Sequence, residues 1–244
     1  MNGQWRAYFR LLAVQGAWNY ERMLGVGMGY AAEPLLEDLR SADPARYAEA
    51  AVRSAEFFNC HPYIAGLALG ATVRAEYDQI PGPQIVRLRT ALCSPLGALG
   101  DQLFWSGVLP ALIGGALVAT GLGAGAGVVL AFLVLYNAGR LATGYWSLRT
   151  GLLTGMNVGR AISASWLPRA ARFVGPIAGF VIGAAVPVIA SWALAWAPSN
   201  RILAALGVAC AGIVLSLLFR HRVTSVRFGL ALLALTLVWR WTTS

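Results

Sequence analysis

Several polar side chains gather around one aromatic residue near the start of the chain, and they are of the types that bind sugars. Gln15, Asn19, Glu21 and Arg22 flank Trp18. Amide and carboxylate groups hydrogen-bond to sugar hydroxyls, while an aromatic ring covers an apolar sugar face. The alternative is a structural network at a subunit or membrane interface, in which Glu21 and Arg22 pair with neighbouring groups. Both interpretations stay open at this point.

Three more polar residues are candidates for substrate contact or gating. Asn59 and His61 precede a proline, which pushes the residue before it out of helical geometry, so Asn59 is also a candidate helix C-cap. Asp101 stands between a stretch rich in Gly and Pro and an apolar run. A carboxylate in lipid costs about 2.5–3.5 kcal/mol, so Asp101 should face protein, water or ligand. It could also cap the following helix, and the two roles are compatible.

The residue types argue against catalysis and against metal or cofactor binding. No acidic residue follows Asp101, no DxD pair occurs, and the lack of Lys rules out a Walker-type phosphate loop. Cys60, Cys93 and Cys210 are widely spaced, which favours three small buried side chains. We therefore expect no catalytic residue, metal or cofactor, and a membrane-embedded transferase is disfavoured.

The composition indicates that these residues are positioned by a membrane protein. The chain has 244 residues, of which 58% are hydrophobic and 12% charged, whereas a soluble domain carries about 25% charged residues. All ten acidic residues lie between Glu21 and Asp101, while residues 102–244 hold ten Arg and no acid. Because these Arg residues flank apolar runs, they indicate anchoring at lipid headgroups and not nucleic-acid binding.

The first 101 residues are predicted to form amphipathic, interfacial and re-entrant helices. Residues 3–18 form an amphipathic pattern that suits a helix lying in the membrane interface or on the protein's own surface. Asp43 is a suitable N-cap, and the helix it begins is expected to end at His61-Pro62. Two apolar segments are shorter than the about 20 residues that a membrane-spanning helix needs, and we expect them to be re-entrant or buried. They are Ile64–Val73 and Ala91–Gly100.

Residues 102–244 are predicted to form the transmembrane region. The five longer apolar runs cover residues 103–122, 126–146, 173–197, 202–219 and 226–241. If all five span, the Arg-rich loops 140–172 and 220–227 share one face, which the positive-inside rule makes cytoplasmic. The predicted fold is an all-α integral membrane protein, with interfacial and re-entrant N-terminal helices followed by about five transmembrane helices.

Four stretches of the chain carry a family resemblance. They are QGAWNYERM from Gln15, EFFNCHPYIAG from Glu56, SPLGALGDQLFW from Ser94 and YNAGRLATGYW from Tyr136. In order and spacing they resemble the IID subunits of the mannose/fructose/sorbose-type, phosphoenolpyruvate-dependent sugar phosphotransferase system. The resemblance implies a multi-pass protein of the bacterial cytoplasmic membrane.

The same resemblance implies a division of labour among partners. A IID subunit pairs with a IIC subunit to form the translocation path for a hexose-like sugar, and the IIC–IID pairs assemble into a trimer. Separate IIA and IIB proteins carry the phosphoryl group, so IID itself is not phosphorylated and is not an enzyme alone. Residues 94–101 depart from the family pattern G-P-L-x-G-x-G-D, because Ser94 replaces the first Gly and Gly97 is displaced by one position. This departure keeps open a non-transporting assembly or regulatory role in the same complex.

Overall fold

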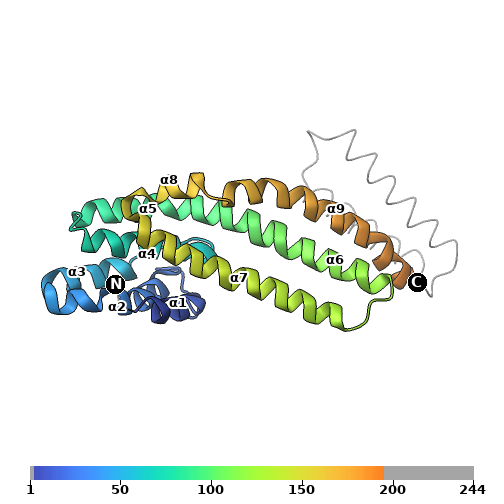
Figure 1. Cartoon of the computed structure of the whole chain (residues 1–244), viewed down its shortest axis with the longest axis horizontal. Helices are drawn as coiled ribbons and strands as arrows, with labels where there is room; N and C mark the ends of the chain where they lie inside the picture. Colours follow the sequence, from blue (N-terminus) through green and yellow to red (C-terminus); the bar gives the residue numbers. More distant parts are fainter. Residues whose placement is uncertain (1–2, 195–244) are drawn as a thin grey trace, which may run out of the picture. The chain divides into compact units, whose positions relative to one another are not determined.

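The computed structural model describes residues 3–194, which fold into α-helices joined by short 3-10, π and extended segments (Figure 1). Contacts between Cα atoms divide the chain into two units, Met1–Val188 and Ile189–Ser244. Of the second unit, the described residues are the last turns of α9. The helices are α1 (Gln4–Leu12), α2 (Gly25–Ala42), α3 (Pro44–Ala55), α4 (Ala65–Tyr77), α5 (Gly82–Gly100), α6 (Leu109–Gly121), α7 (Gly127–Thr154), α8 (Val158–Ala164) and α9 (Leu167–Leu194).

Helices α1 to α4 pack around a hydrophobic core that extends onto α7. The buried side chains at its centre include Met28, Leu35, Leu36, Phe58 and Leu67, each at most 1% exposed. Helix α2 supplies much of this core, although the sequence analysis predicted no helix there. Helix α1 ends at Leu12 and is therefore shorter than the predicted segment 3–18. Trp5 and Phe9 on α1 are exposed, as an interfacial helix requires.

The predicted start of α3 is confirmed, and its predicted end is wrong. The Asp43 carboxylate accepts a hydrogen bond from Arg46 N at 3.0 Å, and the following Pro44 is the first helical residue. The helix ends at Ala55 and not at His61, because Glu56 is extended and the chain after it pairs through Phe58 with another segment. Asn59 lies beyond this end, so it does not cap α3.

A buried carboxylate joins α3 to α4. The Glu76 side chain is 3% exposed, and it accepts from Arg53 Nε at 2.9 Å and lies 3.0 Å from Arg46 Nη2. A buried charge of this kind is tolerated only when it is paired and hydrogen-bonded. Two guanidinium groups from one helix therefore fix the orientation of α4 against α3.

Glycines allow α4 and α7 to pack in very close contact. A Cβ on Gly66 would overlap Ser147 Oγ, and one on Gly151 would overlap the carbonyl oxygen of Leu67. Helices of membrane proteins approach in this way through small residues. The contact holds the second half of α7 against the N-terminal helices.

Helix α5 continues without a break into a π-helix, Asp101–Val108, and then into α6. Ala91–Gly100 is therefore not a separate short segment, as the sequence analysis expected. The expected boundary after residue 101 falls inside this helical stretch, and the membrane assignment of either side stays a prediction. Asp101 itself has helical backbone angles and its side chain makes no cap, so the capping alternative is wrong.

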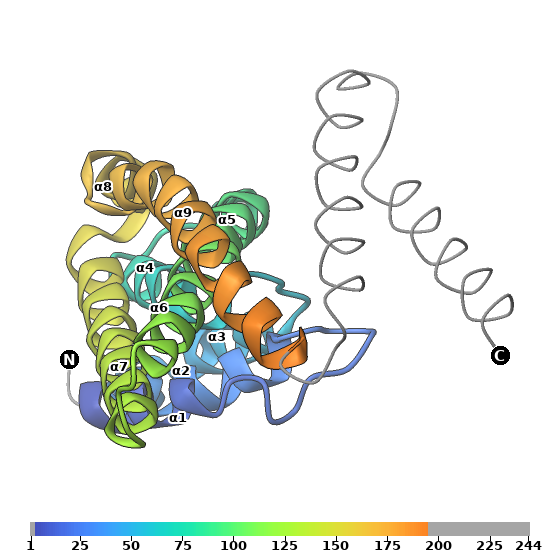
Figure 2. The same cartoon turned by 90° about the vertical axis from the view of Figure 1, so that its right-hand side faces the viewer.

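Helix α6 lies between α7 and α9 (Figure 2). Along the π-helix and α6, glycines spaced by seven residues face valines with the same spacing on α9. The pairs are Gly107 with Val174, Gly114 with Val181 and Gly121 with Val188. A seven-residue contact repeat is the pattern of left-handed helix packing, in which each valine fits the space above a glycine.

Two helical stretches, Gly82–Gly121 and Gly127–Trp192, contain segments long and apolar enough to cross a membrane. Helix α7 runs on to Thr154, so Arg140 and Arg149 lie in a helix and not in the expected loop 140–172. The reason is the packing of α7 on α4, which continues past the apolar run. The predicted runs 202–219 and 226–241 and the loop 220–227 lie outside the described residues, and the number of spans stays a prediction.

Candidate functional site

The first family stretch, Gln15–Met23, forms a turn that Asn19 stabilises from inside. Asn19 Oδ1 accepts hydrogen bonds from Glu21 N at 3.1 Å and Arg22 N at 2.8 Å, while Met23 N donates to Asn19 O at 2.8 Å. Asn commonly closes turns through its own side chain. Met23 adopts a positive φ of 51°, which completes the reversal. The hydrogen bonds of Asn19 Oδ1 therefore lie within the turn, and a role of this stretch in a sugar site or at a subunit or membrane interface stays a prediction.

The remaining side chains of this turn lie on the surface. Trp18 packs edge-on against Tyr20, with 4.8 Å between the ring centroids, and both rings are exposed. Glu21 and Arg22 are also exposed, with 3.6 Å between Arg22 Nε and Glu21 Oε1. Together they present an aromatic and polar surface of the composition that a sugar or a partner subunit could contact.

The second family stretch pairs with this turn through backbone hydrogen bonds. Phe58 N donates to Arg22 O at 3.2 Å, and Leu24 N donates to Phe58 O at 2.8 Å. A Cβ on Gly25 would overlap the carbonyl oxygen of Glu56, so the two segments approach as closely as backbones can. Two stretches more than thirty residues apart in sequence thus form one unit.

A buried arginine from α5 holds the same junction from the other side. Arg89 Nη2 donates to Ser54 O and Glu56 O, both at 2.9 Å, and its guanidinium carbon lies 4.9 Å from the centroid of the Phe58 ring. The residue is 3% exposed. Arg89 could not be predicted from the sequence, because its partners are carbonyl groups 33 and 35 residues away that no sequence pattern reveals.

His61 links the second stretch to the third. Its ring stacks on Phe104 at 5.1 Å between centroids, and it meets Trp105 at 5.0 Å. The side chain is 1% exposed, and Nδ1 accepts a hydrogen bond from Tyr63 N at 3.3 Å. Burial lowers the pKa of His61 to about 4, so the imidazole is neutral at physiological pH. Burial likewise raises the pKa of the neighbouring Cys60 thiol and leaves it unreactive.

Asp101 is the first residue of the π-helix, within the third family stretch. Its side chain is exposed, and it makes no hydrogen bond or ion pair with residues 3–194. Trp105, four residues on, is half exposed. π-Helical segments inside longer helices often mark functional sites, because they re-aim the side chains of the following turn.

Gln15 belongs to a separate small cavity. This cavity has a volume of about 80 Å³ and is lined by Tyr8, Gln15, Tyr63, Arg140 and Ser147 among others. Arg140 comes from the fourth family stretch, on α7. The cavity therefore joins the first, second and fourth stretches, and Arg140 is not among the site residues predicted from the sequence.

The structure brings the family stretches together but not the side chains of all candidates. Asn19 and His61 have partners within the protein, while Asn59 is exposed, as are Trp18, Glu21, Arg22 and Asp101. Among the described residues no three His, Cys, Asp or Glu side chains are arranged to hold a metal ion. The contact of any of these candidates with a sugar stays a prediction.

The chain is similar to known proteins over most of its described length. A family profile for the IID component of the mannose/fructose/sorbose family of phosphotransferase systems matches residues 2–200. The mannose-specific EIID component of Escherichia coli strain K12 is 30% identical over 186 residues, which are 73% of this chain and 65% of that protein. The fructose permease IID component of Bacillus subtilis strain 168 is 32% identical over 177 residues, 70% of this chain and 63% of that protein.

Solved structures show the same likeness. A structure described as a membrane protein superposes with a TM-score of 0.64 at 28% identity and covers 74% of this chain and 68% of that chain. A structure of the mannose transporter ManYZ with microcin E492 gives a TM-score of 0.58 at 27% identity, with coverages of 75% and 69%. This chain spans about two thirds of the length of the curated relatives.

The long apolar helices and the likeness to a membrane transporter define the class as an all-α membrane transport component. Within that class, the chain belongs to the IID component family of the mannose/fructose/sorbose phosphotransferase systems. The family that the four sequence stretches indicated is thereby confirmed.

Proposed function

We propose that this chain pairs with a IIC subunit to form the translocation path of a mannose-family phosphotransferase system. In this role it couples the uptake of a hexose-like sugar to phosphorylation by IIB, and it carries no phosphoryl group itself. The curated relatives are named for mannose, fructose and sorbose, and one solved relative is a mannose transporter. Its place is the bacterial cytoplasmic membrane, in a trimer of IIC–IID pairs served by IIA and IIB.

One observation carries the proposal: three family stretches far apart in sequence meet at one junction. The turn at 15–23 pairs with residues 56–58, and His61 packs on the π-helix that begins at Asp101. The junction leaves a carboxylate and aromatic rings exposed at its edges and buries the groups that fix them. A shared path with IIC requires such a surface, with polar groups for sugar hydroxyls and a rigid support behind them.

The direct test is phosphoenolpyruvate-dependent uptake of labelled glucose, mannose, fructose and glucosamine. Cells that express the cognate IIA, IIB and IIC are compared with and without this chain. We expect uptake with accumulation of sugar phosphate only when the chain is present, and the accepted sugar identifies the substrate.

The second candidate function is that of a non-transporting assembly or regulatory subunit. It is motivated by the altered stretch at 94–101, in which no neighbouring segment packs closely against Gly97. A methyl group added at this position would have no atom nearer than 4.0 Å, so the displaced glycine is not required by close contact. Copurification with IIC without any effect on uptake of the four sugars would favour this role over transport.

A further inference from the structure

Arg140 carries a positive charge that no group in the described part of the chain neutralises. Its guanidinium carbon lies 5.2 Å from the centroid of the Tyr63 ring, and neither a hydrogen bond nor an ion pair joins it to residues 3–194. Several arginines of the N-terminal helices have a carboxylate within 4.0 Å, such as Arg6, Arg10, Arg46, Arg53 and Arg74. Arg149, Arg160, Arg169 and Arg172 share with Arg140 the lack of such a partner among residues 3–194, but none of them lines the small cavity beside Gln15. No acidic residue occurs after Asp101, so the sequence of α7 offers Arg140 no partner.

Arg140 lines a cavity large enough for a small polyatomic anion. Its volume of about 80 Å³ is several times the roughly 10–15 Å³ that one water molecule requires. Gln15 lines the same cavity, and its side-chain amide is not engaged elsewhere among the described residues. A forked guanidinium and an amide N–H are donors that phosphate oxygens accept well.

Arg140 also marks a change in the surroundings of α7. Before it, the helix exposes a set of aliphatic side chains that are between 48% and 64% exposed, namely Val129, Leu130, Leu133, Val134 and Leu135. After it, Thr143, Ser147 and Leu148 are buried against α4 and its neighbours. If the first part faces lipid, Arg140 lies where the hydrocarbon region ends.

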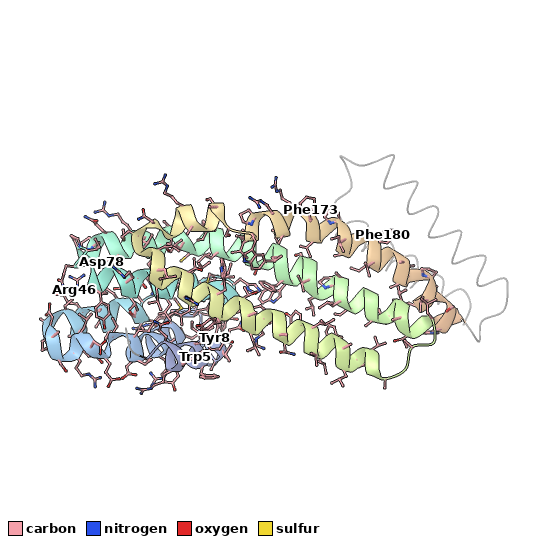
Figure 3. The ribbon with its side chains drawn as sticks, viewed as in Figure 1. Trp5, Tyr8, Arg46, Asp78, Phe173 and Phe180 are labelled. Carbon is pink, nitrogen blue, oxygen red and sulfur yellow. The ribbon has the colours of Figure 1, made fainter. Side chains whose placement is uncertain are left out.

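Aromatic residues beside the cavity also indicate that Arg140 lies at the boundary of the hydrocarbon region. Trp5 stacks on Tyr145 with 4.9 Å between the ring centroids, and Trp5 and Phe9 are 59% and 62% exposed. Figure 3 shows Trp5 and Tyr8 alongside α7, and Tyr8 OH donates to Leu141 O at 2.9 Å. Trp and Tyr gather at the headgroup level of membranes, where amphipathic helices also lie.

We propose that Arg140, with Gln15, binds the phosphodiester of an anionic phospholipid headgroup. The uncompensated charge selects lipids of net negative charge, and the exposed rings of α1 lie beside the acyl chains. The bound lipid fixes α1 to α7 at the membrane surface. This inference rests on the membrane location in the proposed function and adds a ligand to it.

The test uses the full chain, expressed with its IIC partner and purified from membranes. Retained phosphatidylglycerol and phosphatidylcholine are counted by native mass spectrometry after exchange into equimolar mixed micelles. We expect preferential retention of phosphatidylglycerol and a loss of about tenfold in Arg140→Gln, because charge-assisted hydrogen bonds are lost. Arg160→Gln is the matched control, since Arg160 is exposed on α8 and the same charge is removed outside the cavity. Arg140→Lys keeps the charge without the fork, should Arg140→Gln fail to assemble, and should retain an intermediate amount.

Three results overturn the lipid site. One is equal retention in wild type and both Arg140 variants. Another is displacement of phosphatidylglycerol by millimolar inorganic phosphate that itself binds, which makes this a free-anion site. The third is a carboxylate of the IIC subunit paired with the Arg140 guanidinium in a structure of the complex. A chain absent from the membrane fraction would instead contradict the proposed function, so the two failures are distinguishable.

Discussion

Gly100 lies directly against His61, so that a methyl group at position 100 would overlap the Cβ of the imidazole side chain. The backbone of Gly100 is ordinary helix, with φ −69° and ψ −43°. Glycine is therefore required here by the close approach and not by an unusual conformation. This contact packs the second family stretch directly against the third, at the residue that precedes Asp101.

Gly100→Ala should destabilise the protein by about 1–3 kcal/mol, because the added methyl must displace a buried ring that is already packed between aromatic neighbours. Gly97→Ala is the matched control on the same helix, where the nearest atom to the added methyl is Cys60 Cα at 4.0 Å. Denaturant or thermal unfolding of the purified complex measures both. Equal stabilities of the two variants would show that His61 moves away from the added methyl group without loss of folding free energy.

Glu76→Gln should cost about 3–5 kcal/mol, since it removes a buried charge that is paired with two partly buried guanidinium groups. Glu49→Gln removes a carboxylate from the same Arg53, but Glu49 is mostly exposed, so its loss should cost no more than about 0.5 kcal/mol. The comparison of unfolding midpoints checks the difference. A similar small effect for both would contradict the assignment of Glu76 as the anchor between α3 and α4.

Arg89→Gln should destabilise the junction by about 1.5–3 kcal/mol, because a charged donor to two buried carbonyl groups is lost. Arg87 is exposed two residues earlier on the same helix, and Arg87→Gln should be close to neutral. Limited proteolysis between residues 15 and 60 provides a local readout. Cleavage should increase in Arg89→Gln alone, and unchanged cleavage would mean that the junction holds without the guanidinium.

Local sequence rules predicted those parts of the fold that local physics decides. The Asp43 cap with Pro44 set the start of α3, because a side chain and its own helix suffice for that contact. Helix α2 was missed because Gly25, Gly27 and Gly29 weaken its helical pattern. The structure uses these glycines for backbone contacts, as at Gly27 against Val14 O.

The sequence predicted which segments form the candidate site, but it did not predict the residues that hold those segments in place. The family stretches identified the turn at Asn19, His61 and Asp101, whereas Arg89 and Arg140 received no weight. Their partners are carbonyl groups or a ring from distant segments, such as Glu56 O and Tyr63. Long-range contacts of this kind leave no periodicity or spacing to detect, so only the folded chain reveals them.

Stability should fall as the pH drops from about 6.5 toward 4, because of His61. Its pKa is lowered to about 4 in the folded state, against about 6.5 in an unfolded chain. Above pH 6.5 both states are neutral and the effect is absent. Below it the unfolded state takes up a proton that the folded state excludes, at a slope of up to about 1.4 kcal/mol per pH unit. Thermal scans of His61→Gln should show a flatter profile across this window, and an unchanged profile would assign the acid sensitivity to other groups.

Asp101→Asn should leave the complex assembled and lower sugar uptake by about tenfold or more, a loss on the scale of one charge-assisted hydrogen bond. The prediction follows from the position of the carboxylate, which is exposed at the start of the π-helix and forms no hydrogen bond or ion pair with residues 3–194. Removal of its charge therefore breaks no such contact among residues 3–194, so a lost activity would come from a contact outside this part of the chain, such as one with sugar, water or the IIC subunit. Asp38→Asn provides the control, because Asp38 is an exposed carboxylate on α2. Initial uptake rates measured over a range of sugar concentrations separate the roles: a raised KM indicates sugar contact, while a lowered maximal rate at unchanged KM indicates gating. Uptake equal to that of wild type, with normal amounts of assembled complex, would remove Asp101 from the translocation path.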